Sequence, residues 1–167
     1  MANLGYIGLG VMGSRMVDRL MAKGHTVVGH NRTKSKAQWL LDRGMAWGET
    51  PRAVAAAADV TFVMVTDSAA LAAVTDGPDG LVEGLGPGKL VIDMSTVSPA
   101  AIRALAERVR AKGGDMVDSP VSGSVKVPLP TTSVSNDYLT AGRAMGLEKK
   151  DFAAVFQVLA KMAGVNE

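Results

Sequence analysis

The sequence contains no cysteine, which excludes disulfides, thiolate chemistry and cysteine-based zinc sites. Its two histidines, His25 and His30, are too few for us to expect a histidine metal site. Aromatic residues make up only 4% of the chain, so we expect an aliphatic core with little surface for stacking on bases. No apolar run approaches the roughly 20 residues that a membrane-spanning helix requires.

The charges are nearly balanced, with 18 basic and 16 acidic residues interspersed along 167 positions. No polycationic tract is present, so nucleic acid is not the expected partner. The first predicted strand begins by Leu4, which leaves no room for a signal peptide, and no membrane segment is expected. These features predict a cytoplasmic protein.

Short apolar runs alternate with segments of helical periodicity, a pattern typical of a parallel α/β sheet covered on both faces. We predict strands at residues 4–8, 25–30, 45–47, 60–65, 90–93 and 116–118. Helices are predicted at 11–23, 34–43, from Pro51, at 68–74 and at 99–112. Six such strands match the Rossmann-type dinucleotide-binding sheet. Residues 1–124 therefore form the predicted Rossmann domain, and 125–167 form a connector followed by two amphipathic helices, 131–145 and 148–163.

A glycine-rich motif, G-x-G-x-x-G, lies between the first predicted strand and the first helix. Its glycines allow a tight turn, close approach of a pyrophosphate and close packing of helix on strand. Backbone amides and the positive end of the helix would face the phosphates. The alternative is a chance glycine-rich turn. The predicted cofactor-binding residues here are Gly8, Leu9, Gly10, Val11, Met12 and Gly13.

The end of the second predicted strand favours NADP over NAD. An NAD site usually carries an acidic residue there for the ribose hydroxyls, whereas residues 29–36 contain no carboxylate. Arg32 could bind a 2′-phosphate by charge-assisted hydrogen bonds. Asn31 and Thr33 would add neutral hydrogen bonds, and Lys34 or Lys36 would add positive potential. The alternative is a solvated basic turn that caps the next helix.

Three ordered motifs resemble the β-hydroxyacid dehydrogenase family, which includes 3-hydroxyisobutyrate dehydrogenases and glyoxylate or succinic semialdehyde reductases. The glycine motif extended to Met16 resembles the N-terminal signature of the family. The second motif, D-x-S-T-x-x-P, spans residues 93–99, and the third, at 118–124, is similar to the D-A-P-V-S-G-G substrate loop. The Ser-Gly-Ser variant followed by Lys126 is most similar to the NADP-dependent glyoxylate and succinic semialdehyde reductases.

The resemblance implies hydride transfer between nicotinamide and a small semialdehyde or 3-hydroxyacid. It places Thr96, with Ser95, beside the nicotinamide ribose and the substrate. It further implies that Ser122, Gly123 and Ser124 bind the substrate carboxylate, with Ser122 and Thr96 as catalytic candidates. The adenosine-ribose side would be lined by Val65, Thr66 and Asp67. The alternatives are that Ser95 and Thr96 begin a helix and that Ser122 and Gly123 form an ordinary turn.

The likeness breaks after Lys126. The family continues with more sheet and an interdomain helix whose G-x-x-x-K-x-x-N-N segment carries the acid/base lysine, and this sequence has no such segment. Residues 127–133 instead resemble a segment near the family's C-terminus, so the chain looks like the front and back of a longer enzyme. An engineered miniature, a natural deletion or a sequence lacking its middle would each fit. Lys126 is the candidate replacement acid; the alternative is a solvated loop lysine.

Two function classes follow from these residues. The first is an NADPH-dependent 3-hydroxyacid dehydrogenase or semialdehyde reductase, with an imine reductase as a related possibility. The second is an NADP-binding module with little or no turnover, because the lysine segment is absent. The apolar faces of the two C-terminal helices predict a homo-oligomer.

Overall fold

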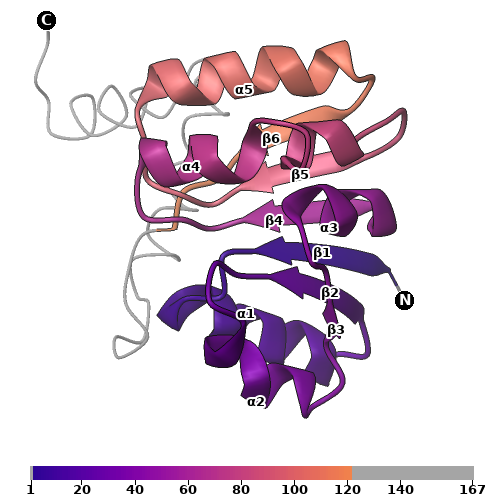
Figure 1. The fold of residues 1–167 in the computed structure, drawn as a ribbon. Helices are drawn as coiled ribbons and strands as arrows, with labels where there is room; N and C mark the ends of the chain where they lie inside the picture. Colours follow the sequence, from indigo (N-terminus) through magenta and orange to yellow (C-terminus); the bar gives the residue numbers. More distant parts are fainter. Residues whose placement is uncertain (1, 122–167) are drawn as a thin grey trace, which may run out of the picture. The chain divides into compact units, whose positions relative to one another are not determined.

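The computed structural model describes residues 2–121. Six strands pair in parallel in the order β3-β2-β1-β4-β5-β6 (Figure 1). This sheet confirms the predicted Rossmann-type fold, and every predicted strand agrees with an observed one within two residues at each end. The strands are β1 (Asn3–Ile7), β2 (Thr26–His30), β3 (Ala46–Trp47), β4 (Val60–Val63), β5 (Leu90–Asp93) and β6 (Asp115–Asp118).

Helices cover both faces of the sheet. On one face lie α1 (Val11–Ala22) and α2 (Gln38–Leu41), and on the other lie α3 (Pro51–Ala57), α4 (Ser68–Thr75) and α5 (Pro99–Ala111) (Figure 1). Successive side chains of a strand point to opposite faces, so Tyr6 joins the core under α1 and α2, while Ile7 joins the core under α3 to α5. Both side chains are fully buried.

Two segments differ from the sequence prediction. The helix predicted at 34–43 is instead a 3-10 turn, η1 (Lys34–Ala37), followed by the short α2. Of the four residues of η1, only Ala37 is buried, so no apolar stripe holds this turn in α-helical form. A second 3-10 turn, η2 (Leu81–Gly84), occupies the glycine-rich stretch 77–88, where Leu81 and Val82 are buried against α3.

Several predicted features lie outside the described residues. They are the substrate loop with Ser122, Gly123 and Ser124, the candidate acid Lys126, the helices at 131–145 and 148–163, and the oligomer contacts assigned to those helices. Among the described residues, no helix is long and apolar enough to cross a membrane.

Candidate functional site

The carboxyl ends of the strands meet at one edge of the sheet, where the predicted site residues follow. The register places His30, Ile7, Val63, Asp93 and Asp118 side by side across five strands. In open parallel sheets, ligands bind beyond this edge, at the point where the strand order reverses. Here the order reverses between β1 and β4, beside the glycine-rich turn.

Two glycines of the glycine-rich turn have no room for a side chain, and one has open space beside it. Gly8 has φ +97°, and a side chain there would overlap the carbonyl oxygen of Met64. A Cβ on Gly13 would overlap the carbonyl oxygen of Gly8, whereas a Cβ on Gly10 would meet no atom of the described residues within 4 Å. Gly8 and Gly13 thus close the turn, and Gly10 presents an open surface that a pyrophosphate could approach.

The first turn of α1 is suited to an anion. None of the described side chains caps its N-terminus at Gly10, and Val11 in the first turn is 73% exposed. The first amides of a helix have no partner within the helix, and they add to the positive end of its dipole. A phosphate group could accept hydrogen bonds from these amides, and its negative charge would be stabilised by the helix dipole.

Asn31 has a structural role that the sequence did not reveal. Its Oδ1 accepts a hydrogen bond from the Leu9 amide at 3.1 Å, and its Nδ2 donates to the Thr33 carbonyl at 3.0 Å. The Leu9 amide, predicted to face a phosphate, is therefore used within the protein, and the Leu9 side chain is buried. Asn31 ties the glycine-rich turn to the end of β2.

Positive charge at the end of β2 comes from Arg32 and Lys36. Both are exposed, and neither forms an ion pair with any of residues 2–121. Lys34 is already engaged, since its Nζ lies 3.1 Å from Glu49 Oε1 and 5.0 Å from the centre of the Trp47 ring. Two of the three predicted cations are therefore available to a ligand.

At the end of β4, Asp67 caps α4. Its Oδ1 accepts from the Ala70 amide at 2.8 Å, and its Oδ2 accepts from the Thr66 hydroxyl at 3.0 Å. These bonds lower the pKa of the Asp67 carboxyl, and the positive charge of Arg32 lowers it further. The charge of Arg32, after β2, therefore acts on Asp67, after β4, although the two residues are distant in sequence.

At the end of β5, neither Ser95 nor Thr96 caps the following helix, α5. Ser98 is the N-cap of α5, accepting from the Ala101 amide at 3.3 Å, and Pro99 follows it. The alternative in which Ser95 and Thr96 begin this helix is therefore wrong. Ser95 is buried, and its Oγ accepts from the Val65 amide at 3.0 Å, whereas Thr96 is exposed at the edge.

Asp93, which precedes these residues, is fully buried. Its Oδ1 accepts from the Ser95 amide at 3.0 Å, and its Oδ2 has no hydrogen-bond partner in the described part of the chain. Burial raises the pKa of the Asp93 carboxyl, the hydroxyl and amide of Ser95 lower it in part, and the nearby Asp118 raises it. In the sequence, Asp93 stands out only as the first residue of the D-x-S-T-x-x-P motif.

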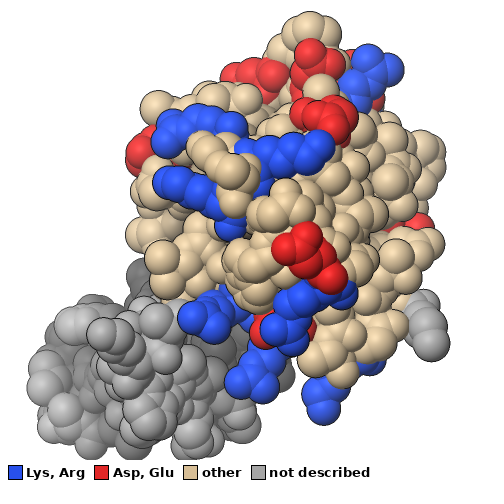
Figure 2. All heavy atoms as spheres, turned by 60° about the horizontal axis from the view of Figure 1, so that its bottom comes forward, with Lys and Arg blue, Asp and Glu red and all other residues tan. Residues whose placement is uncertain are grey.

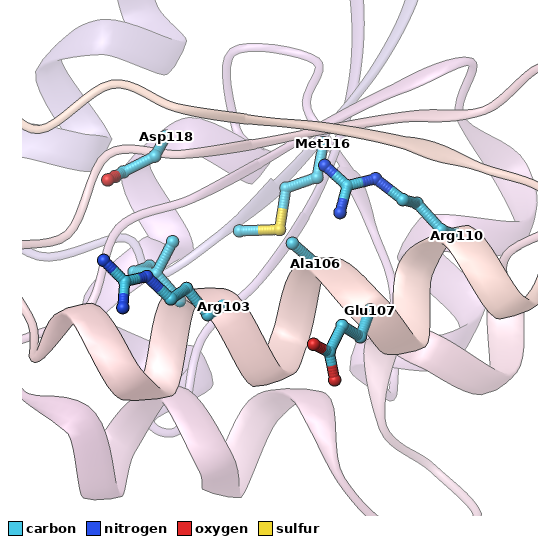
Figure 3. A pocket seen from close by; sticks show the side chains of 7 residues that line it. Arg103, Ala106, Glu107, Arg110, Met116 and Asp118 are labelled. Atoms are coloured by element: carbon cyan, nitrogen blue, oxygen red, sulfur yellow. The ribbon is translucent and has the colours of Figure 1, made fainter. Parts of the chain in front are cut away.

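Two hollows of about 300 Å³ each lie on the described surface. One is lined by Val11, Ser14, Arg15 and Trp39, at the start of α1 beside α2. The other lies between α5 and β6, three strands from the glycine-rich turn. Figure 3 shows Met116 there beside Ala106, with Arg103 and Arg110 on either side.

The charges on the α1 and α2 side are mixed: Figure 2 shows acidic side chains among the lysines and arginines of this face. Among residues 2–121, no three histidine, aspartate or glutamate side chains are placed to hold a metal ion.

The reversed strand order, the closed glycine turn and the uncapped helix start together define a Rossmann-type dinucleotide-binding domain. The model of one family, the NAD binding domain of 6-phosphogluconate dehydrogenase, matches residues 3–165. The chain belongs to this family, which confirms the resemblance to 3-hydroxyisobutyrate dehydrogenase-like proteins that the sequence motifs indicated.

Two curated relatives illustrate the likeness. The cytokine-like nuclear factor N-PAC of Xenopus tropicalis is 40% identical over 121 residues, covering 72% of this chain and 23% of that protein. The uncharacterized oxidoreductase YkwC of Bacillus subtilis is 32% identical over 159 residues, covering 95% of this chain and 52% of that protein. The chain thus spans between about a quarter and about half of the length of these relatives.

Solved structures extend the comparison. Psf3 in complex with NADP+ and 2-OPP is 37% identical with a TM-score of 0.69, covering 74% of this chain and 44% of that chain. The 3-hydroxyisobutyrate dehydrogenase ygbJ of Salmonella typhimurium is 27% identical with a TM-score of 0.67, covering 74% and 43%. An imine reductase of Streptomyces aurantiacus is 30% identical with a TM-score of 0.61, covering 70% and 40%.

Proposed function

We propose that this chain is the NADPH-binding part of an oxidoreductase that transfers a hydride between nicotinamide and a small semialdehyde or 3-hydroxyacid, of the glyoxylate or succinic semialdehyde type. The observation that carries the proposal is the open carboxyl edge, where the uncapped start of α1, the exposed Arg32 and the exposed Thr96 follow three different strands. The similarity to Psf3, whose solved structure is a complex with NADP+, supports the choice of cofactor class.

The residues fit such a cofactor. The amides at the start of α1 would bind the pyrophosphate next to Gly10. Arg32, with Lys36 nearby, would pair with a 2′-phosphate, and Thr33 would donate a neutral hydrogen bond. When bound, the nicotinamide supplies or accepts the hydride. Thr96 would orient the reacting groups, Ser122, Gly123 and Ser124 would bind the substrate carboxylate, and Lys126 would supply the proton.

Arg32→Ala tests the preference for NADPH over NADH. The loss of charge-assisted hydrogen bonds to a 2′-phosphate should weaken NADPH binding by about tenfold to a hundredfold and leave NADH binding nearly unchanged. Isothermal titration calorimetry with both cofactors measures the difference. Lys34→Ala is the matched control, because Lys34 is paired with Glu49. Equal losses for both cofactors would contradict the assignment of Arg32.

Turnover is tested by following NADPH oxidation with glyoxylate and with succinic semialdehyde. Consumption that falls in Lys126→Met would support the reductase and the proton role of Lys126. Saturable NADPH binding without consumption would favour the second candidate, a binding module. That candidate is supported by the absent lysine segment and by the relatives named as a nuclear factor.

An imine reductase is the third candidate, favoured by the likeness to solved imine reductases. The serine-rich segment 122–124 argues against it, because an imine needs no carboxylate site. A cyclic imine in the same NADPH assay separates the two substrate classes.

We also propose that the chain self-associates and that it is located in the cytoplasm. A monomeric mass by light scattering would contradict self-association.

A further inference from the structure

We propose that Asp93 is a positioning residue of the cofactor site, which aligns the ends of β4 and β5 by holding Ser95. The inference rests on the proposed function, since the aligned segments are those assigned to NADPH. It adds a residue that has no expected contact with cofactor or substrate.

A chain of hydrogen bonds carries the proposal. Asp93 Oδ1 accepts from the Ser95 amide at 3.0 Å, and Ser95 Oγ accepts from the Val65 amide at 3.0 Å. One carboxyl group of β5 thus fixes the backbone of its own strand end and, through Ser95, the strand end of β4. The Asp93 carbonyl oxygen also accepts from the Ser119 amide at 2.8 Å, which joins the end of β6 to the same point.

Asp93 is an unfavourable residue to place here. It is the only charged side chain of residues 2–121 that is buried, and one of its oxygens lacks a partner there. Burying a carboxyl group is unfavourable unless hydrogen bonds compensate. Oδ1 can accept from the Ser95 amide whether the carboxyl is charged or neutral, so the alignment depends on the acceptor and not on the charge.

The consequence for the site lies in Thr96. Ser95 is fixed on one side by Asp93 and Val65, and Ser98 is fixed on the other, because its amide donates to Ser68 Oγ at 3.1 Å. The exposed Thr96 therefore lies on a short segment anchored at both ends. Supporting hydrogen bonds of this kind hold ligand-contacting groups in place before the ligand binds.

The test compares NADPH affinity in Asp93→Ala, Asp93→Asn and Ser95→Ala. Asp93→Ala leaves the Ser95 amide without an acceptor and should raise the Kd for NADPH about tenfold. Asp93→Asn keeps an acceptor oxygen and should rescue most of that loss. Ser95→Ala removes only the bond to the Val65 amide and keeps the Ser95 amide bonded to Asp93, so it should raise the Kd less than Asp93→Ala does.

Thr75→Ala is the control for a purely structural effect. Thr75 is also buried, and its hydroxyl donates to the Leu71 carbonyl at 2.9 Å, but it lies at the end of α4, away from the carboxyl edge. It should lower the melting temperature while leaving the Kd for NADPH within about twofold. Melting curves for all variants establish that each is folded at the temperature of the titration.

Amide hydrogen exchange, measured by NMR without cofactor, gives a second readout. The Ser95 and Val65 amides should be protected in the wild type and exchange faster in Asp93→Ala, or in Asp93→Leu if the alanine variant does not fold. Unchanged Kd in Asp93→Ala, failure of Asp93→Asn to rescue, or unprotected amides in the wild type would overturn the role of Asp93. If the wild type binds no NADPH, the proposed function fails, and the exchange rates still decide whether Asp93 aligns the two strand ends.

Discussion

At the amino edge of the sheet, where the strands begin, Lys89 donates to the carbonyls of Ala55, Ala56 and Ala58 at 2.9, 3.0 and 2.7 Å. These are the unpaired carbonyls at the end of α3. Arg108 lies 2.7 Å from Asp76, which follows the last residue of α4. At the carboxyl edge, by contrast, the start of α1 has no described side chain as a cap, and Arg32 and Thr96 are exposed.

The same sheet therefore treats its two edges differently. At the amino edge, long basic side chains fold back on helix ends and stabilise them. At the carboxyl edge, Arg32 and Thr96 are exposed, whereas supporting groups such as Asn31 and Ser95 are hydrogen-bonded within the protein. Substitutions at the first edge should change stability alone, while substitutions at the second should change ligand binding.

The largest effect is expected at the glycine turn. Gly8→Ala places a side chain at positive φ and against the Met64 carbonyl, so it should abolish NADPH binding and lower stability by about 2 kcal/mol or more. Gly10→Ala meets no atom of residues 2–121 within 4 Å, so this variant should keep its melting temperature while losing affinity for NADPH. Thermal unfolding with NADPH titration separates them; a stable Gly8→Ala that binds NADPH would contradict the closed turn.

A smaller effect is expected at the amino edge. Lys89→Met removes three charge-assisted hydrogen bonds and should cost about 2 kcal/mol, or about 5 °C in melting temperature. Lys112→Met, which breaks one exposed pair with Glu83, should cost less than about 1 kcal/mol. Urea unfolding measures both. A change in NADPH affinity in either variant would contradict the expectation that the amino edge contributes to stability alone.

The raised pKa of the Asp93 carboxyl should make the free energy of unfolding depend on pH. Because the pKa of its carboxyl is raised in the folded protein, the folded state holds that proton more tightly than the unfolded state does. The contribution of the Asp93 carboxyl to the free energy of unfolding is fully present below the ordinary pKa of about 3.9. It declines as pH rises through the raised pKa of the folded protein. Asp93→Asn removes this decline. Urea titrations of both proteins from pH 4 to 7 measure it; parallel curves would show that the folded pKa is not raised.

The smallest effect is expected for Tyr6→Phe. The Tyr6 hydroxyl lies 3.2 Å from Met16 Sδ and 3.6 Å from Met64 Sδ, and thioethers are weak acceptors. Removing it should change the free energy of unfolding by less than about 0.5 kcal/mol, as measured by urea unfolding, with NADPH affinity unchanged. A loss above about 1.5 kcal/mol would show that this hydroxyl supports the turn above it.

Much of the site could be predicted because its signals are local. The spacing of Gly8, Gly10 and Gly13 between a strand and a helix indicated the turn, and the sheet confirms that context. The missing carboxylate after β2 is equally local. Ser98 as the cap of α5 was missed because Ser95, Thr96 and Ser98 have similar capping chemistry, and only packing shows which of them precedes the helix.

The sequence by itself determined the alternation of strands and helices, the parallel sheet and the position of the glycine turn, because each depends on periodicity or on backbone freedom within a few residues. The tertiary structure alone decided that Asn31 holds Leu9, that the charge of Arg32 acts on Asp67, and that Asp93 and Ser95 join two strand ends. These relations depend on which strand ends become neighbours, and hydrogen bonds across a sheet join residues that are distant in the chain.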